Sequence, residues 1–137
     1  MLVSLLLAVS TAAPECNHIP IDRMIDQYAA LIKNQESASI AHLFGESGIV
    51  DNPGAAPIRG KAAIGAFLSS FKGAVVKSES MTIADVGRVG EDWRVTGRFH
   101  QTGTTPQGKD YDASGSFDST WTCTADGWRL KRMATGK

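Results

Sequence analysis

The chain has 137 residues, 42% of them hydrophobic, and its 14 Lys and Arg residues balance 14 Asp and Glu residues. This length and composition fit one folded domain with its own core and exclude an intrinsically disordered chain. A formal net charge of zero leaves no basic face for nucleic acid or an anionic membrane.

Residues 1–13, MLVSLLLAVSTAA, carry no charged side chain and end in small residues. Thr11 and Ala13 suit the small-residue positions of a signal-peptidase site. The apolar run is too short to span a bilayer, which needs about 20 residues. We therefore predict a signal peptide at 1–13, a connector at 14–19 and one domain at 20–137, with export to the periplasm or the medium. The alternative is a frayed first element of a truncated gene product.

The two cysteines, Cys16 and Cys123, leave two interpretations open. An oxidising compartment permits a disulfide, which would close a loop of about 100 residues. In the other interpretation, Cys16 is a mobile thiol and Cys123 a small core residue. Of the two, the unbridged pair is the expectation.

Two helices are expected before the first strand. Pro20 stands where a helix can begin, and apolar residues at helical spacing continue to about Asn34. A short second helix begins near Ser37, a favoured capping residue, and ends at Gly45 and Gly48.

Residues 48–60, GIVDNPGAAPIRG, contain a short apolar strand that stops at a carboxylate, an amide and a proline. The loop then leads into a third helix at about 61–71, whose apolar residues recur at i, i+3, i+4 and i+7. Asp51 therefore ends a buried strand beside a sharply bent loop. A carboxylate there needs hydrogen-bond partners or has a shifted pKa.

From residue 75 onward, apolar and polar residues alternate. We expect strands at about 75–89, 93–100, 111–123 and 128–133, with Asp126 and Gly127 making a hairpin turn. Helices followed by antiparallel strands predict an α+β domain. Three N-terminal helices would pack on a curved, mostly antiparallel sheet and form a cone with an internal pocket.

This order of elements resembles the nuclear-transport-factor-2-like superfamily, with its cystatin-like cone. Within it, the chain is most similar to the SnoaL-like and ketosteroid-isomerase-like group of small stand-alone domains. The resemblance is carried by Tyr28, by HLFGESGIVDNPGAAPIRGKAAIGAF at 42–67 and by ADGWRLKR at 125–132. It covers about residues 19–134 and is more specific for fold than for activity, because the superfamily holds isomerases, cyclases, dehydratases, binders and association modules.

The resemblance implies a site inside the cone. Asp51 falls in the column of the ketosteroid-isomerase general base, and Tyr28 falls near the oxyanion-donating tyrosine if one residue is dropped between them. Asp118 falls near the column of the partner acid, but it faces outward if Phe117 faces the core. The implied enzyme is a cofactor-free isomerase or cyclase in which Asp51 moves a proton and Tyr28 or His100 stabilises the oxyanion.

Each catalytic candidate has a structural alternative. Asp51 either transfers a proton or caps the loop by accepting its N–H groups. Tyr28 either donates into the cavity or packs in the core with its hydroxyl at the rim. His100 shares one side of a strand with Arg94 and Arg98, and that side faces either the cavity, solvent or a second subunit.

Further residues are expected to line the ligand pocket: Ile25, Phe44, Ile49, Arg59, Phe67, Trp93, Phe99 and Trp121. The aromatic members make either a wall for a flat ligand or simply the core. Arg59 either holds a carboxylate ligand or pairs with Asp51.

No metal and no cofactor are expected. The three histidines lack the spacing of metal ligands, and no phosphate-binding loop or nucleotide motif occurs. The expected function is an exported domain that binds a small apolar molecule in the cone, either as an enzyme or as a non-catalytic binding or dimerisation module. We expect no nucleic-acid partner, no membrane association after signal removal and, from the resemblance, a homodimer.

Overall fold

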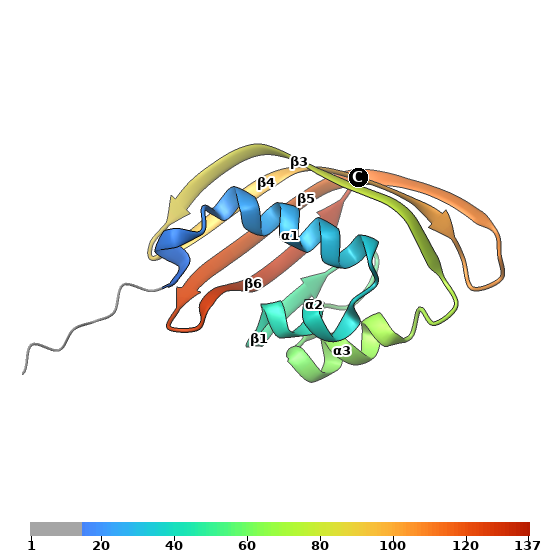
Figure 1. The fold of residues 1–137 in the computed structure, drawn as a ribbon, viewed down its shortest axis with the longest axis horizontal. Coiled ribbons are helices and arrows are strands. Elements are labelled where there is room, and N and C mark those ends of the chain that lie inside the picture. The colour runs from blue at the N-terminus through green and yellow to red at the C-terminus, as the bar shows by residue number, and fades with distance from the viewer. Residues whose placement is uncertain (1–14) are drawn as a thin grey trace, which may run out of the picture.

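The computed structural model describes residues 15–137, so the predicted signal peptide at 1–13 lies outside the described residues. The elements, in chain order, are η1 (Glu15–His18), α1 (Ile21–Lys33), α2 (Ser37–Leu43), β1 (Phe44–Asp51), β2 (Ile58–Arg59), α3 (Lys61–Ser69), β3 (Val75–Val89), β4 (Asp92–Thr104), β5 (Asp110–Thr124) and β6 (Gly127–Gly136). Three α-helices pack on a six-stranded, curved, mostly antiparallel sheet, which confirms the predicted α+β cone (Figure 1). Among residues 15–137, no helix combines the length and apolar character needed to cross a bilayer.

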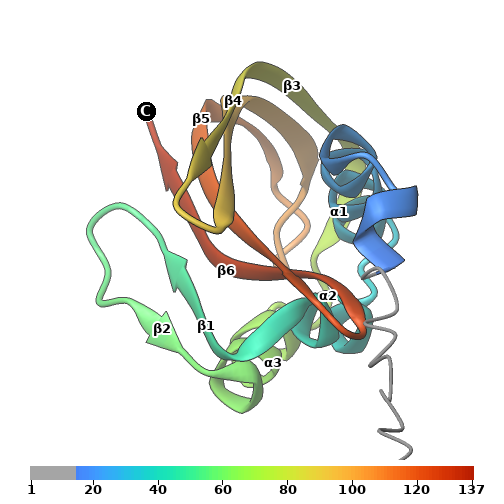
Figure 2. The same ribbon diagram turned by 90° about the vertical axis from the view of Figure 1, so that its left-hand side faces the viewer.

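The sheet has the order β2-β1-β6-β5-β4-β3. The last four strands form an antiparallel meander, and β1 adds to β6 in parallel. Figure 2 shows the sheet bending around α1, while α2 and α3 close the lower side and the β1–β2 arm projects away. Helices and sheet thus enclose the interior of the cone.

Side-chain alternation assigns a concave face and an outer face to the sheet. On β4 and β5, Val95, Phe117 and Trp121 are at most 2% exposed and lie on the concave face. Their strand neighbours Arg94 and Asp118 lie on the outer face, where they bond to each other. The core therefore sits between the concave face and the helices, as expected for a sheet with one buried side.

The structure differs from the sequence-based boundaries at β1. The strand begins at Phe44 rather than near Gly48, and its register with β6 shifts between Phe44 and Ile49. A Cβ added at Gly48 would stand 2.8 Å from the Cβ of Phe44, so the chain needs glycine to make this irregularity. The two glycines that the sequence assigned to a helix end belong to a bulged strand instead.

Cys16 and Cys123 form a disulfide that joins η1 to β5, with their Cα atoms 6.0 Å apart. The expectation of an unbridged pair is therefore wrong. The reason is that η1 packs against the end of β5 and β6, where Cys16 is only 3% exposed.

Candidate functional site

The cone holds a cavity of about 680 Å³, a size typical of small-molecule sites. It lies where α1 and α3 end and α2 begins, against the concave face of β3, β4 and β5. Its walls are largely apolar, with a few polar groups. The lining residues are Ile32, Gln35, Ser37, Ile40, Leu68, Ser69, Phe71, Lys72, Gly73, Ala74, Val76, Gln101, Thr105, Pro106 and Tyr111.

A chain of hydrogen bonds forms the polar part of the inner wall. Tyr111 donates its hydroxyl proton to Oε1 of Gln101 at 2.8 Å, and Nε2 of Gln101 donates to Oε2 of Glu79 at 2.7 Å. The three residues come from three neighbouring strands and are all half-buried. Gln101 and Tyr111 line the cavity, whereas Glu79, beside Gln101 on β3, is not one of the lining residues. We call this the Glu79–Gln101–Tyr111 chain.

Burial changes the acidity of this region. It raises the pKa of Glu79, although the bond from Gln101 and the charge of His100 act in the opposite direction. Burial also raises the pKa of Tyr28 and Tyr111, and the negative charge of Glu79 adds to both shifts. Both phenols therefore keep their protons at neutral pH, and Tyr28 on α1 shares the electrostatic environment of Glu79.

A glycine on β4 makes the position of Tyr111 possible. Gly103 pairs with Tyr111 across the two strands. A Cβ added at Gly103 would stand 2.7 Å from the hydroxyl oxygen of Tyr111. Because glycine leaves this space open, the phenol lies across β4 and reaches Gln101.

Gln35 fixes the mouth of the cavity. Its Nε2 donates to the carbonyl of Ala74 at 2.7 Å, and its Oε1 accepts from the N–H of Val76 at 3.0 Å. The side chain thereby joins the loop after α1 to the start of β3. Gln35 adopts a φ of 55°, a conformation that a non-glycine residue adopts only where its surroundings hold it.

The structure separates the two principal catalytic candidates. Tyr28 packs against the core on the concave side. Asp51 lies on the outer face, because it pairs with Ala134, which in turn pairs with the outward-facing Asp118. There its Oδ2 accepts from Nη2 of Arg132 at 2.6 Å, rather than from loop N–H groups or from Arg59. The catalytic role of Asp51 stays a prediction.

His100 also lies on the outer face. Its Nε2 is 2.7 Å from Oδ1 of Asp112, and both side chains are at least half exposed, at 50% and 71%. On the same face, Arg94 donates two hydrogen bonds to Asp118, at 2.9 Å and 2.6 Å. This pairing lowers the pKa of Asp118 below its usual range. The side chain of Asp118 therefore does not point into the cone.

The residues expected to line the pocket fall into two groups, and none of them is among the residues that line the cavity. Ile25, Phe44 and Trp121 are fully buried core residues, and Trp93 and Phe99 pack against that core. Phe67 packs edge-on against Phe71, which itself lines the cavity. Ile49 and Arg59 pair with each other at the β1–β2 edge, on the face that carries Asp51. Apart from Phe67, the predicted pocket residues therefore belong to the core or to the β1–β2 edge. The cavity is lined by other residues, many of them near the helix ends.

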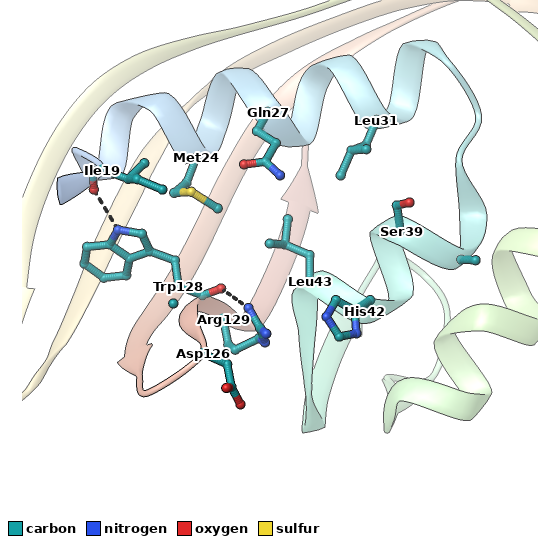
Figure 3. Close-up of a pocket in the computed structure, with 12 residues that line it drawn as sticks. Ile19, Met24, Gln27, Leu31, Ser39, His42, Leu43, Asp126, Trp128 and Arg129 are labelled. Atoms are coloured by element: carbon teal, nitrogen blue, oxygen red, sulfur yellow. Dashed lines mark hydrogen bonds between the residues drawn. The ribbon is translucent and has the colours of Figure 1, made fainter. Parts of the chain in front are cut away.

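A second cavity, of about 530 Å³, lies outside the cone between α1, α2 and the β5–β6 hairpin. In Figure 3, Met24, Leu31 and Leu43 form its apolar side, and Arg129 and Asp126 stand at its edge. The indole of Trp128 donates to the carbonyl of Ile19 at 2.8 Å and closes one end. Within residues 15–137, no group of His, Cys, Asp and Glu side chains is arranged to hold a metal ion.

Sequence reasoning missed Glu79, Gln101 and Tyr111. One signal was present: Glu79 shares strand parity with Met81 and Ile83, so a carboxylate occupies an inward position. Gln101 and Tyr111 likewise share strand parity with Phe99 and Phe117, but which of these inward side chains meet depends on the register between β4 and β5.

The comparisons with known proteins agree with this fold. The model of the SnoaL-like domain family matches residues 20–134. No curated protein matches the sequence. Among solved structures, an NTF2-like protein with a cystatin-like fold from Novosphingobium aromaticivorans is 20% identical, with a TM-score of 0.70 over 88% of this chain and 80% of that chain.

Two further solved structures have the same fold. A ketosteroid isomerase-like protein from Erwinia carotovora atroseptica is 18% identical, with a TM-score of 0.73 over 88% of this chain and 94% of that one. The protein Aln2 from a Streptomyces species is 14% identical, with a TM-score of 0.74 over 91% and 92% of the two chains. At these identities the likeness shows the fold alone.

Proposed function

Because the chain belongs to the SnoaL-like domain family, we propose that it binds a small, largely apolar molecule in the cavity of its cone. One observation carries the proposal: a cavity of about 680 Å³ has apolar walls and a hydrogen-bonded polar patch at its inner side. Such a combination binds ligands by burying apolar surface while a few polar groups fix their orientation.

The test is the binding of N-phenyl-1-naphthylamine, an uncharged fluorescent probe. Ala74 lines the cavity, whereas Ala84 is exposed elsewhere on β3. Ala74→Phe should fill the cavity and abolish the fluorescence increase. Ala84→Phe adds the same side chain outside the cavity and should leave binding unchanged. Equal binding by both variants would place the probe elsewhere and contradict the proposal.

A second candidate function is a cofactor-free isomerase or cyclase-type reaction. The sequence predicts Asp51 as the proton-transfer base of this reaction. However, Asp51 lies on the outer face of the sheet, whereas Tyr28 on α1 packs on the concave side. Glu79 is the carboxylate whose charge acts on Tyr28, and burial favours its proton-accepting character. If turnover of small ketones or enones is found, Glu79→Gln should abolish it. The sequence-based form requires the same loss from Asp51→Asn.

We also propose that the domain is exported. The Cys16–Cys123 disulfide supports this, because disulfides persist in oxidising compartments, as does the apolar character of residues 1–13. Expression of the full chain in a bacterium, followed by cell fractionation and mass spectrometry, should find a periplasmic or secreted form that begins at Pro14. An uncleaved chain in the cytoplasm would contradict the proposal.

A homodimer is proposed from the family resemblance. The outer face supports it as a contact surface, since Arg94, Thr96 and Arg98 lie there together and are exposed or half-exposed. Analytical ultracentrifugation should give twice the monomer mass. A monomer at high protein concentration would exclude a stable dimer.

A further inference from the structure

The ligand's polar group follows from the direction of the hydrogen bonds in the cavity wall. An ionised carboxylate only accepts hydrogen bonds, so Glu79 turns the N–H₂ end of the Gln101 amide toward itself. The amide oxygen of Gln101 must then point at Tyr111 and accept its hydroxyl proton. The single hydroxyl proton of Tyr111 is donated to Gln101 within the wall. Toward the cavity, the Tyr111 oxygen can therefore only accept hydrogen bonds.

The other polar side chains that line the cavity belong to the mouth and the helices rather than to this wall: Gln35, Lys72 and Thr105 near the mouth, Ser37 on α2 and Ser69 on α3. The amide of Gln35 is engaged with the backbone of Ala74 and Val76. The Oγ1 of Thr105 accepts from the N–H of Lys109 at 3.2 Å, so its own proton remains available at the mouth, away from the Glu79–Gln101–Tyr111 chain. Lys72 is the one charged residue that lines the described cavity, and it is exposed at the rim.

We propose that the cavity selects apolar molecules that carry a hydrogen-bond donor, such as an alcohol or phenol, over ethers and carboxylates of the same shape. This proposal rests on the proposed function. Glu79 does not contact the ligand in this proposal. It is a positioning residue that sets the direction of the Glu79–Gln101–Tyr111 chain. The donor of the ligand bonds to the Tyr111 oxygen.

The experiment compares three probes of one shape, 2-naphthol, 2-methoxynaphthalene and 2-naphthoate, by calorimetry at neutral pH. We expect 2-naphthol to bind about three- to tenfold more tightly than 2-methoxynaphthalene, as one neutral hydrogen bond allows. The carboxylate should bind most weakly, because its charge meets the lone pairs of Tyr111 and the field of Glu79.

Variants separate the positioning role from general packing. Tyr111→Phe removes the acceptor and should abolish the preference for 2-naphthol. Glu79→Gln keeps the shape but leaves a group that can donate or accept, so the preference should shrink while 2-methoxynaphthalene binds as before. Asp85→Asn makes the same chemical change at an exposed position of β3 and should change nothing. If Tyr111→Phe does not fold, the three probes on the unaltered protein decide.

Two results would overturn the inference while leaving the proposed function in place. One is equal binding of 2-naphthol and 2-methoxynaphthalene. The other is tightest binding of 2-naphthoate that Lys72→Met removes, which would assign recognition to the rim. Failure of all three probes to bind would overturn the proposed function and the inference together.

Discussion

Arg132 Nη2 lies 2.6 Å from Asp51 Oδ2 on the outer face of the sheet, with both side chains partly exposed. Ion pairs of this kind contribute about 0.2–1 kcal/mol. We expect Asp51→Asn to lower the free energy of unfolding by no more than that and to leave ligand binding in the cone unchanged. Urea denaturation and probe titration check both points. Loss of turnover with the fold intact would instead support the sequence-based role of Asp51 as a base.

The Cys16–Cys123 disulfide closes a loop with a sequence separation of 107. In the chain-entropy model, a crosslink of this span stabilises by limiting the unfolded state. Cys16→Ser combined with Cys123→Ser should lower the free energy of unfolding by about 2–5 kcal/mol. The measurement is chemical denaturation with and without reductant. A reductant that affects the double variant as much as the unaltered protein would contradict the assignment.

The Arg94–Asp118 pair predicts a loss of stability in acid. Because the hydrogen bonds from Arg94 lower the pKa of Asp118, the folded state binds this proton less readily than the unfolded chain. The contribution is therefore present above the unfolded value of about 3.9 and is lost as pH falls through the folded pKa. Urea denaturation across acid pH should show this loss, and Asp118→Asn should reduce it. An unchanged acid profile in the variant would contradict the prediction.

The raised pKa of Glu79 predicts a dependence of stability on pH that is opposite in sign to that of Asp118. Burial raises its pKa, so the folded state binds the proton more readily than the unfolded chain. Its contribution to stability is fully present below the unfolded value of about 4.3 and is lost as pH rises through the folded pKa. Glu79→Gln should flatten the stability profile in this window. Carboxyl-resolved NMR titration measures the pKa directly, and a value at or below that of free Glu would refute the assignment.

Gly103 predicts a packing effect. Gly103→Ala would place a methyl group 2.7 Å from the Tyr111 hydroxyl oxygen and against the carbonyl oxygen of Val75. Overpacking of this kind costs about 1–3 kcal/mol. The control is Gly87→Ala on β3, where an added Cβ meets no atom within 4 Å, and its effect should stay within about 0.5 kcal/mol. Thermal denaturation of both variants tests the contrast.

The fold was predictable from local pattern, because helical spacing before residue 72 and alternation after residue 75 each report one buried face. The site was not. Asp51 alternates with Val50, and whether it faces inward depends on the parallel pairing of β1 with β6, which brings Val50 beside the buried Met133. Strand register moves every side chain of a strand between faces when it shifts by one residue. Nothing near Asp51 in the sequence encodes that register.

The same limit explains why the Glu79–Gln101–Tyr111 chain escaped prediction. Its members are separated by 22 and 10 residues along the chain, and they meet only through the registers of β3 with β4 and of β4 with β5. Parity places Gln101 and Tyr111 on the inward side of their strands, but it does not reveal which inward side chains touch each other. The position of Tyr111 also depends on Gly103. The sequence shows that this residue lacks a side chain, but only the structure shows that the Tyr111 ring needs the space.

The place of β6 in the sheet has a consequence for how the protein folds. The strand is the last element in the chain, yet it lies between β1 and β5 and bonds to both. β1 therefore has no neighbour in the meander until residues 127–136 take their place. The β1–β6 pairing joins segments that are far apart in the chain, and non-local pairing of this kind slows folding. Until β6 is in place, β1 and β5 each present an unpaired edge, the feature through which incompletely folded chains associate.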